Sequence, residues 1–180
     1  MPISYAPPPR VVEFQKAMVF IDGTNLFHRL ASAKLKLSSL GKLLRQFSQG
    51  RQIVRVYMYT TQPHYDEAKR IHGSVVVDAL RVVFGDTVPS GGGNVKEKGV
   101  DALLVADLIY HAAAKNYDYA ILVSTDQDFA RALKRVEDFG CRTGVISICA
   151  QAPALLRESC DDLFEVNEKD MLSNGWAVQA

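Results

Sequence analysis

The sequence predicts an α/β fold built on a parallel sheet. Short apolar runs alternate along the chain with longer segments whose apolar residues recur at helical spacing. The clearest runs are continuous rather than alternating with polar residues, which is typical of strands buried on both faces of a parallel sheet. The repeated strand–helix order indicates right-handed crossover units between neighbouring parallel strands.

The first strand is predicted over residues 17–21 (AMVFI), an apolar run followed by Asp-Gly. Residues 24–34 follow as a helix, and a second helix is predicted over residues 38–48, where Gly50 ends it. Residues 53–60 (IVRVYMYT) are rich in β-branched and aromatic side chains and predict the next strand.

The middle of the chain is less regular. Pro63 is placed to open a helix over about residues 64–80, because proline is tolerated at the start of a helix. A weak strand is predicted over residues 82–84. The stretch from Gly85 to Gly99 is polar and rich in glycine, so we expect a flexible loop with Gly91–Gly93 as a mobile flap.

The second half of the chain returns to regular alternation. Helices are predicted over residues 100–114, 129–140 and 153–160, and strands over residues 119–124, 143–148 and 163–166. We expect residues 1–15 to form an extended N-terminal lead-in, residues 16–168 a single domain and residues 169–180 a C-terminal tail.

Composition narrows the class of protein. The 180 residues suit one domain, and 48% hydrophobic with 23% charged residues is typical of a soluble globular protein. A net charge of +1 means that a nucleic acid would have to be held by a local basic patch. Three cysteines without metal-ligand spacing predict a reducing, cytoplasmic setting, and no apolar stretch is long enough to span a membrane.

Four aspartates lie where predicted strands end or helices begin: Asp22, Asp101, Asp126 and Asp128. Side chains at the carboxyl ends of parallel strands meet in one crevice, so we expect these carboxylates to lie close together. A cluster of carboxylates repels itself unless a cation neutralises it, and oxygen ligands suit Mg²⁺ or Mn²⁺. The pattern predicts a divalent-metal site and metal-assisted phosphoryl chemistry.

Several of these acids also have purely structural explanations. Asp22 is suited to cap the following helix, and Thr125 to Asp128 resembles a capping box. Asp101 lies in a first helical turn, where the helix dipole favours an anion. Asp126 has no such explanation. Asp107, farther along the helix that holds Asp101, is expected to line the rim or make a structural hydrogen bond.

Three polar residues beside the acids are candidates for substrate binding. Asn25 follows Asp22 by three residues, and its amide suits a phosphate oxygen or the attacking water. Lys96 and Lys98 lie between the expected flap and Asp101, where they could reach a substrate phosphate. Solvated surface lysines are an equally good explanation of that pair.

At these residues the sequence resembles the NYN domain family, specifically the LabA-like branch of the PIN-like nucleases. The resemblance covers residues 17–167 and is carried by three blocks in the expected order: FIDGTNL at 20–26, KEKGVDALLVADLI at 96–109 and YDYAILVSTDQDF at 117–129. It implies a Rossmann-like, three-layer α/β/α sandwich with its parallel strands in the order 3-2-1-4-5.

The resemblance also implies RNA cleavage that depends on Mg²⁺ or Mn²⁺. Asp22, Asp101, Asp126 and Asp128 match the family's acidic metal site. Asn25 matches the polar residue beside the first acid, and Ser124 matches the small hydroxyl residue before the last acids. Thr125 stands where the family usually has glycine, and it is a further candidate for substrate contact.

The leading hypothesis is therefore a metal-dependent ribonuclease acting on single-stranded or looped RNA, with Asp22, Asn25, Asp101, Asp126 and Asp128 as its catalytic residues. One alternative is an inactive RNA-binding or protein-interaction module of the same fold. A phosphatase of the haloacid-dehalogenase type is the weaker alternative, because Phe20 occupies the position of the nucleophilic aspartate. A homodimer is compatible with this class of domain.

Overall fold

The central element is a six-stranded sheet. The structure, a computed structural model, describes residues 15–73, 80–90 and 94–180, without the side chains of residues 94–96. The sheet consists of β1 (Lys16–Asp22), β3 (Gln52–Thr60), β4 (Leu80–Phe84), β7 (Tyr119–Val123), β8 (Arg142–Ile148) and β9 (Asp162–Val166). Their spatial order is β4-β3-β1-β7-β8-β9, and every neighbouring pair is parallel. The predicted order 3-2-1-4-5 is confirmed, with β9 added at the edge.

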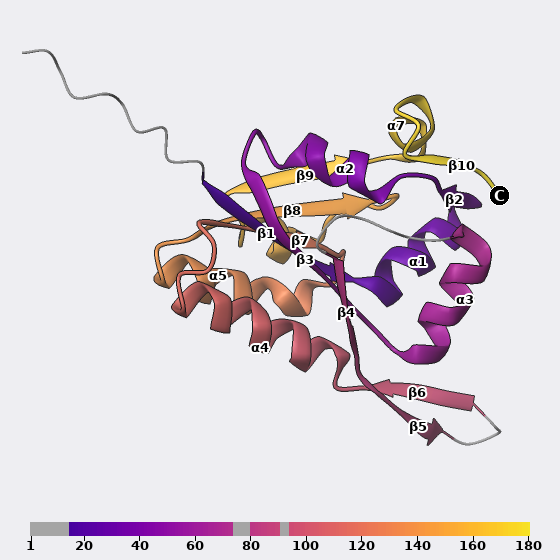
Figure 1. Cartoon of the computed structure of the whole chain (residues 1–180), viewed down its shortest axis with the longest axis horizontal. Helices are drawn as coiled ribbons and strands as arrows, with labels where there is room; N and C mark the ends of the chain where they lie inside the picture. The colour runs from indigo at the N-terminus through magenta and orange to yellow at the C-terminus, as the bar shows by residue number, and fades with distance from the viewer. Residues whose placement is uncertain (1–14, 74–79, 91–93) are drawn as a thin grey trace, which may run out of the picture.

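Helices cover both faces of this sheet (Figure 1). One layer contains α1 (Gly23–Ser32) and α2 (Leu40–Phe47), with α3 (Gln62–His72) beside α1. The other layer contains α4 (Val100–Ala113), α5 (Ala130–Asp138) and the short α6 (Ala154–Arg157). The predicted three-layer α/β/α sandwich is confirmed.

Strand β1 shows why the sequence folds into two cores. Its residues Ala17, Val19 and Ile21 face the layer of α1 and α2, whereas Met18 and Phe20 face the layer of α4 and α5. Successive side chains of a strand point to opposite faces, so a run that is apolar throughout has to be covered on both. The continuous run that predicts this strand is the direct cause of the layered architecture.

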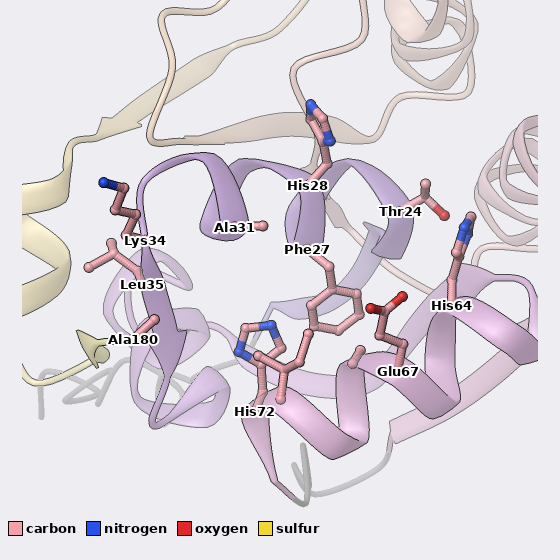
Figure 2. A pocket seen from close by; sticks show the side chains of 12 residues that line it. Thr24, Phe27, His28, Ala31, Lys34, Leu35, His64, Glu67, His72 and Ala180 are labelled. Atoms are coloured by element: carbon pink, nitrogen blue, oxygen red, sulfur yellow. The ribbon is translucent and has the colours of Figure 1, made fainter.

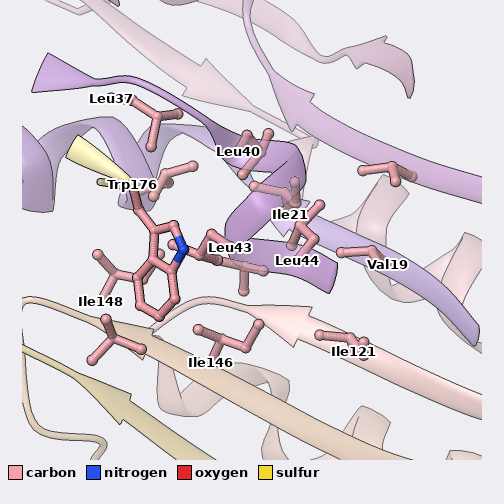
Figure 3. Packing of buried hydrophobic residues seen from close by; sticks show 14 of the residues in the cluster. Val19, Ile21, Leu37, Leu40, Leu43, Leu44, Ile121, Ile146, Ile148 and Trp176 are labelled. Carbon is pink, nitrogen blue, oxygen red and sulfur yellow. The ribbon is translucent and has the colours of Figure 1, made fainter. Parts of the chain in front are cut away.

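The core beneath α2 is closed by a residue from the end of the chain (Figure 3). Leu43 and Leu44 of α2 are fully buried with Ile121 and Ile146 of the sheet. Trp176 packs at the side of this cluster and is 7% exposed. Its backbone carbonyl oxygen accepts hydrogen bonds from the N–H groups of residues 38 and 39 at 2.8 and 3.1 Å.

Residues 169–180, expected as a C-terminal tail, are folded onto the domain. They include most of α7 (Glu168–Ser173) and all of β10 (Ala177–Gln179), which pairs antiparallel with β2 (Leu35–Leu37). Neither three-residue strand is predicted from the sequence, because each is stabilised by a partner more than a hundred residues away rather than by its own pattern.

The expected loop from Gly85 to Gly99 is wrong for the residues described. Strands β5 (Asp86–Ser90) and β6 (Asn94–Lys98) form an antiparallel ribbon in this stretch. The register sets Asp86 opposite Lys98, and cross-strand pairs of opposite charge stabilise such ribbons. The expected flap at 91–93 lies outside the described residues.

The third helix is shorter than predicted. It ends at His72, and Gly73 has a φ of 69°, a left-handed conformation that interrupts a helix. The chain is already extended at Leu80, the first residue of β4. Residues 74–79 lie outside the described part of the chain. None of the helices that the structure describes is both long enough and apolar enough to cross a membrane.

Candidate active site

The site lies where β1 and β7 end beside each other. These strands pair in parallel, with Ile21 opposite Val123, so Asp22 and Ser124 are the next residues on each. The strand order changes direction between β1 and β7, and ligands of open α/β sheets bind at such switch points. The Ser124 hydroxyl donates a hydrogen bond to Asp22 Oδ2 at 3.0 Å.

Asp22 is a buried carboxylate, 6% exposed. It caps α1, because its Oδ1 accepts a hydrogen bond from the Asn25 N–H at 3.0 Å. The predicted capping role is confirmed, and Oδ2 is the oxygen that accepts the hydrogen bond from Ser124. Gly23 allows α1 to begin here, since a Cβ at this residue would lie 2.9 Å from the carbonyl oxygen of Tyr59.

The charge on Asp22 is poorly compensated. Burial raises its pKa to about 6, and the neighbouring charges of Asp101 and Asp126 add to the increase. The hydrogen bonds from Asn25 and Ser124 oppose the increase without cancelling it. Asp22 is therefore held ionised at neutral pH at a cost in stability, which is typical of a functional carboxylate.

Asp126 is linked to Asp22 through Ser124. Its backbone N–H donates to Ser124 Oγ at 3.0 Å, and its Oδ1 accepts from the Asp128 N–H at 2.9 Å. Asp126 thus caps the short 3₁₀ helix η1 (Gln127–Phe129). The proposed capping box led by Thr125 is wrong, because Asp126 takes that position and the Thr125 side chain turns the other way.

Thr125 instead binds α1. Its backbone N–H donates to Asn25 Oδ1 at 3.2 Å, and the Asn25 amide donates to its hydroxyl oxygen at 3.0 Å. Arg29 Nε donates to the same hydroxyl oxygen at 3.1 Å. We call Asn25, Arg29 and Thr125 the latch. It joins the loop after β7 to α1.

Asp101 completes the group from the first turn of α4. Its pKa is raised by desolvation and then by the charges of Asp126, Glu97 and Asp128. The charges of Asp101 and Asp126 also raise the pKa of Asp22, but convergence of the four acids on one metal site stays a prediction. Asp107, in contrast, accepts a hydrogen bond from the Tyr59 hydroxyl at 2.9 Å, which is the structural role expected for it.

Two residues of the site are not predicted from the sequence. Glu97 accepts a hydrogen bond from the Thr24 hydroxyl at 2.7 Å and contacts His64 Nδ1 at 3.1 Å. The sequence pattern that could have identified Glu97 is the alternation Lys-Glu-Lys. This pattern places Glu97 on the opposite face from the two lysines only if the stretch is a strand. Arg29 is signalled by its position four residues after Asn25, on the same face of α1.

Of the two predicted lysines, only Lys98 has a described side chain. Glu97 faces α1 and α3, so the alternation of β6 directs Lys98 to the opposite face of the ribbon. Lys98 is exposed. Lys96 lies in β6, but its side chain is outside the described residues. Phosphate contacts by these two residues stay predictions.

The fit of a divalent cation rests on the chemistry of the donors. Among residues 15–73, 80–90 and 97–180, no three His, Cys, Asp or Glu side chains are close enough together to hold a metal ion. The carboxylates are nevertheless near enough that Asp101 and Asp126 raise the pKa of Asp22. A hard cation with oxygen ligands would relieve that repulsion, so the chemistry of these donors, though not their present geometry, fits Mg²⁺ or Mn²⁺.

Fold and acidic cluster together define a PIN-like α/β domain. The family model for the NYN domain matches residues 16–167. The chain therefore belongs to the NYN domain family, a family of PIN-like nucleases. Assignment to the LabA-like branch stays a prediction.

A solved structure supports the fold. A protein of unknown function from Vibrio parahaemolyticus, VPA0982, is similar with a TM-score of 0.67 and 17% identity, covering 88% of this chain and 97% of that one. A putative oxidoreductase from Parabacteroides merdae has a TM-score of 0.36 and 17% identity over 83% of this chain and 31% of that one, too low to carry an argument. No curated protein matches the chain.

Proposed function

We propose that this protein is a ribonuclease that hydrolyses RNA phosphodiester bonds with the help of Mg²⁺ or Mn²⁺. The observation that carries the proposal is the buried Asp22, whose pKa is raised to about 6 beside Asp101 and Asp126 at the switch point of the sheet. Membership of the NYN domain family supports nuclease chemistry at this position.

Asp22 and Asp126 are the residues we assign as direct metal ligands, with Asp101 and Asp128 completing the set directly or through water. When bound, the cation lowers the pKa of a water ligand and neutralises charge on the phosphate. Ser124 orients both direct ligands, because it donates to Asp22 and accepts from the Asp126 N–H.

The latch acts as a positioning device. Both the carbonyl and the amide group of Asn25 are engaged by Thr125, so Asn25 holds the loop rather than reaching into the opening. Arg29 brings a permanent positive charge to the same loop, where it would attract the RNA backbone. With a net charge of +1, the protein has to rely on such local contacts, which suits single-stranded or looped RNA.

The experiment is an RNA cleavage assay with Mn²⁺, comparing Asp22→Asn and Asp126→Asn with Asp138→Asn. Asp138 is an exposed acid of α5 that pairs with Arg135, so it serves as a matched control. Each site variant should lower turnover by at least about 100-fold, and the control should leave it unchanged. Wild-type turnover in both site variants would overturn the assigned roles.

An inactive RNA-binding or protein-interaction module is the second candidate. It is favoured by the lack, among the described residues, of three acids already converged on one point. Calorimetry separates the two: heat of Mn²⁺ binding that disappears in Asp22→Asn supports the enzyme, and its absence supports the binding module. A phosphatase is disfavoured, because Phe20 is fully buried in the aromatic cluster with Tyr57 and Tyr117.

A further inference from the structure

A cavity of about 410 Å³ lies between α1 and α3 (Figure 2). Its apolar lining includes Phe27 and Ala31 of α1 together with Ala68 and Ile71 of α3. Ile71 is 37% exposed, so the cavity is reached from solvent and is not a sealed gap in the core. Its size and largely apolar lining are those of a small-ligand site.

One wall of the cavity is flat and aromatic. The rings of Phe27 and His72 are stacked, with centroids 5.2 Å apart and an interplanar angle of 20°. His72 is fixed in this position, because its Nδ1 accepts a hydrogen bond from the Leu37 N–H at 3.1 Å. Burial lowers the pKa of His72, so the ring is neutral at physiological pH and the wall is rigid and uncharged.

The cavity is joined to the acidic site by two shared residues. Thr24 and His64 line the cavity, and both contact Glu97, whose charge raises the pKa of Asp101. Thr24 is also only two residues from Asp22 along the start of α1. The Thr24 and His64 side of the cavity therefore leads toward Glu97 and the acids, where a scissile phosphate would be placed.

We propose that this cavity receives one nucleobase of a single-stranded RNA whose backbone lies across the acidic site. A planar base stacks on aromatic rings irrespective of its identity, and a neutral wall accepts it without a charged partner. Base and phosphate belong to the same nucleotide strand. A base in the cavity would therefore bring a neighbouring phosphate close to the acids. This inference rests on the proposed ribonuclease function, which places the RNA backbone at the acids.

Glu67 gives the cavity a preference among bases. Its side chain lines the opening near Phe27 and His64 (Figure 2). A carboxylate accepts hydrogen bonds and donates none, so it favours a base with an exocyclic amino group. Adenine, cytosine and guanine carry such a group and uracil does not. Uracil offers only its ring N3–H on the same edge, so the cavity should bind it more weakly than the amino bases.

The test is a binding scan with short fluorescein-labelled RNAs in which each nucleotide in turn is replaced by an abasic one. Binding is measured by fluorescence anisotropy at low salt with EDTA, so that metal-dependent cleavage does not occur. In the wild-type protein, loss of the base at one position should weaken binding about tenfold, and loss elsewhere should have a smaller effect.

Two variants and a control identify the cavity as the origin of the effect. Ala31→Trp fills the cavity from an exposed position of α1, and Phe27→Leu removes the flat ring while keeping an apolar side chain. Both should remove the position dependence. Ala113→Trp, at an exposed position of α4 on the other face of the sheet, should preserve it. Thermal unfolding of each variant checks that it is folded.

Position-independent binding by the wild-type protein, or a position dependence that survives in folded Ala31→Trp, would overturn the base-binding cavity. The result is independent of catalysis, because the scan is done without metal. Cleavage of RNA without any position dependence would remove the cavity proposal alone. Position-dependent binding by a protein that fails to cleave RNA with Mn²⁺ would remove the ribonuclease proposal and retain the cavity.

Discussion

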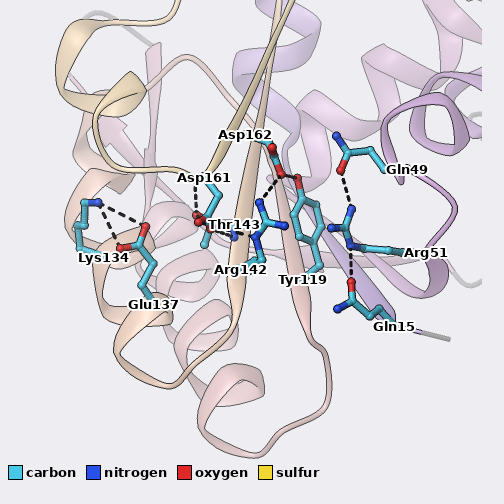
Figure 4. A network of polar contacts seen from close by, with 10 residues as sticks. All are labelled: Gln15, Gln49, Arg51, Tyr119, Lys134, Glu137, Arg142, Thr143, Asp161 and Asp162. Atoms are coloured by element: carbon cyan, nitrogen blue, oxygen red, sulfur yellow. Dashed lines mark hydrogen bonds and ion pairs between the residues drawn. The ribbon is translucent and has the colours of Figure 1, made fainter. Parts of the chain in front are cut away.

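Aspartates at the two ends of the sheet have neighbours of opposite character. At the amino end, Asp162 accepts a hydrogen bond from the Tyr119 hydroxyl at 2.8 Å and lies 3.4 Å from Arg142 (Figure 4). Asp161 accepts from the Thr143 N–H at 2.7 Å on the same side. At the carboxyl end, the neighbours of Asp22 are further acids. Charge is balanced at one end and left unbalanced at the other.

The paired acids at the amino end of the sheet therefore serve stability, and the acids at the carboxyl end serve the proposed function. A carboxylate with hydroxyl and guanidinium partners stabilises the fold, whereas clustered carboxylates destabilise it until a cation arrives. Among the ion pairs between described residues, none involves Asp22, Asp101, Asp126 or Asp128. The sequence thus concentrates its electrostatic strain at the end where open α/β sheets bind their ligands.

The largest expected effect is on the free energy of unfolding. Removal of one acid should raise it at the carboxyl end of the sheet and lower it at the amino end. Asp22→Asn keeps a capping side chain and removes a buried charge, so the free energy of unfolding at pH 7 should rise by about 2 kcal/mol. Asp162→Ala leaves the Tyr119 hydroxyl without its acceptor and removes one of the two carboxylates that contact Arg142, so the free energy of unfolding should fall by about 2 kcal/mol.

Urea unfolding followed by fluorescence of Trp176, the single tryptophan, measures both variants. Asp138→Asn serves again as the control and should change the free energy of unfolding by less than about 0.5 kcal/mol. A loss of stability in Asp22→Asn as large as that in Asp162→Ala would contradict the contrast, since both ends would then be built for stability.

The next effect is a dependence of stability on pH that comes from the carboxyl end. Asp22 has a pKa of about 6 in the folded protein against 3.8 in its ordinary state. The folded state therefore holds the proton more tightly, and the destabilisation present above pH 6 disappears as the pH falls toward 4. This group alone should contribute about 2 kcal/mol of added stability over that interval.

The measurement compares the wild-type protein with Asp22→Asn across the same pH interval. His72 and His111 have lowered pKa values, so their protonation opposes folding as the pH falls and partly hides the effect in the wild type. Because both histidines are present in both proteins, the difference between the two curves isolates Asp22. Parallel curves for wild type and variant would show that Asp22 is not strained by burial.

The fold and the acids are predictable because their signals are local. The continuous run of β1 and the acid that follows it are visible in eight consecutive letters, AMVFIDGT. The Lys-Glu-Lys alternation of β6 is short and follows several glycines, so it does not indicate a strand. The sequence therefore does not predict that Glu97 belongs to the site. The latch is equally hidden, because Asn25 and Thr125 are a hundred residues apart and meet only when β1 and β7 pair.

The smallest expected effect concerns that latch, which lies at the carboxyl end of the sheet and joins α1 to the loop after β7. Thr125→Gly restores the residue usual in the family but removes the hydroxyl that binds Asn25 and Arg29, while the backbone N–H contact to Asn25 remains. The free energy of unfolding should fall by about 1 kcal/mol, from one lost hydrogen-bond acceptor and a more flexible backbone. Thr125→Ser keeps the hydroxyl and should remain near wild type.

Mn²⁺ affinity, measured by calorimetry, shows whether the latch also serves the acids. If it sets the separation of Asp22 and Asp126, Thr125→Gly should bind Mn²⁺ several-fold more weakly, and Thr125→Ser should bind as the wild type does. Equal affinity in all three proteins would mean that Ser124 alone positions the two acids, because its hydroxyl contacts both segments without the latch. The Ser124 hydroxyl would then be sufficient to position Asp22 and Asp126 despite the repulsion between their charges.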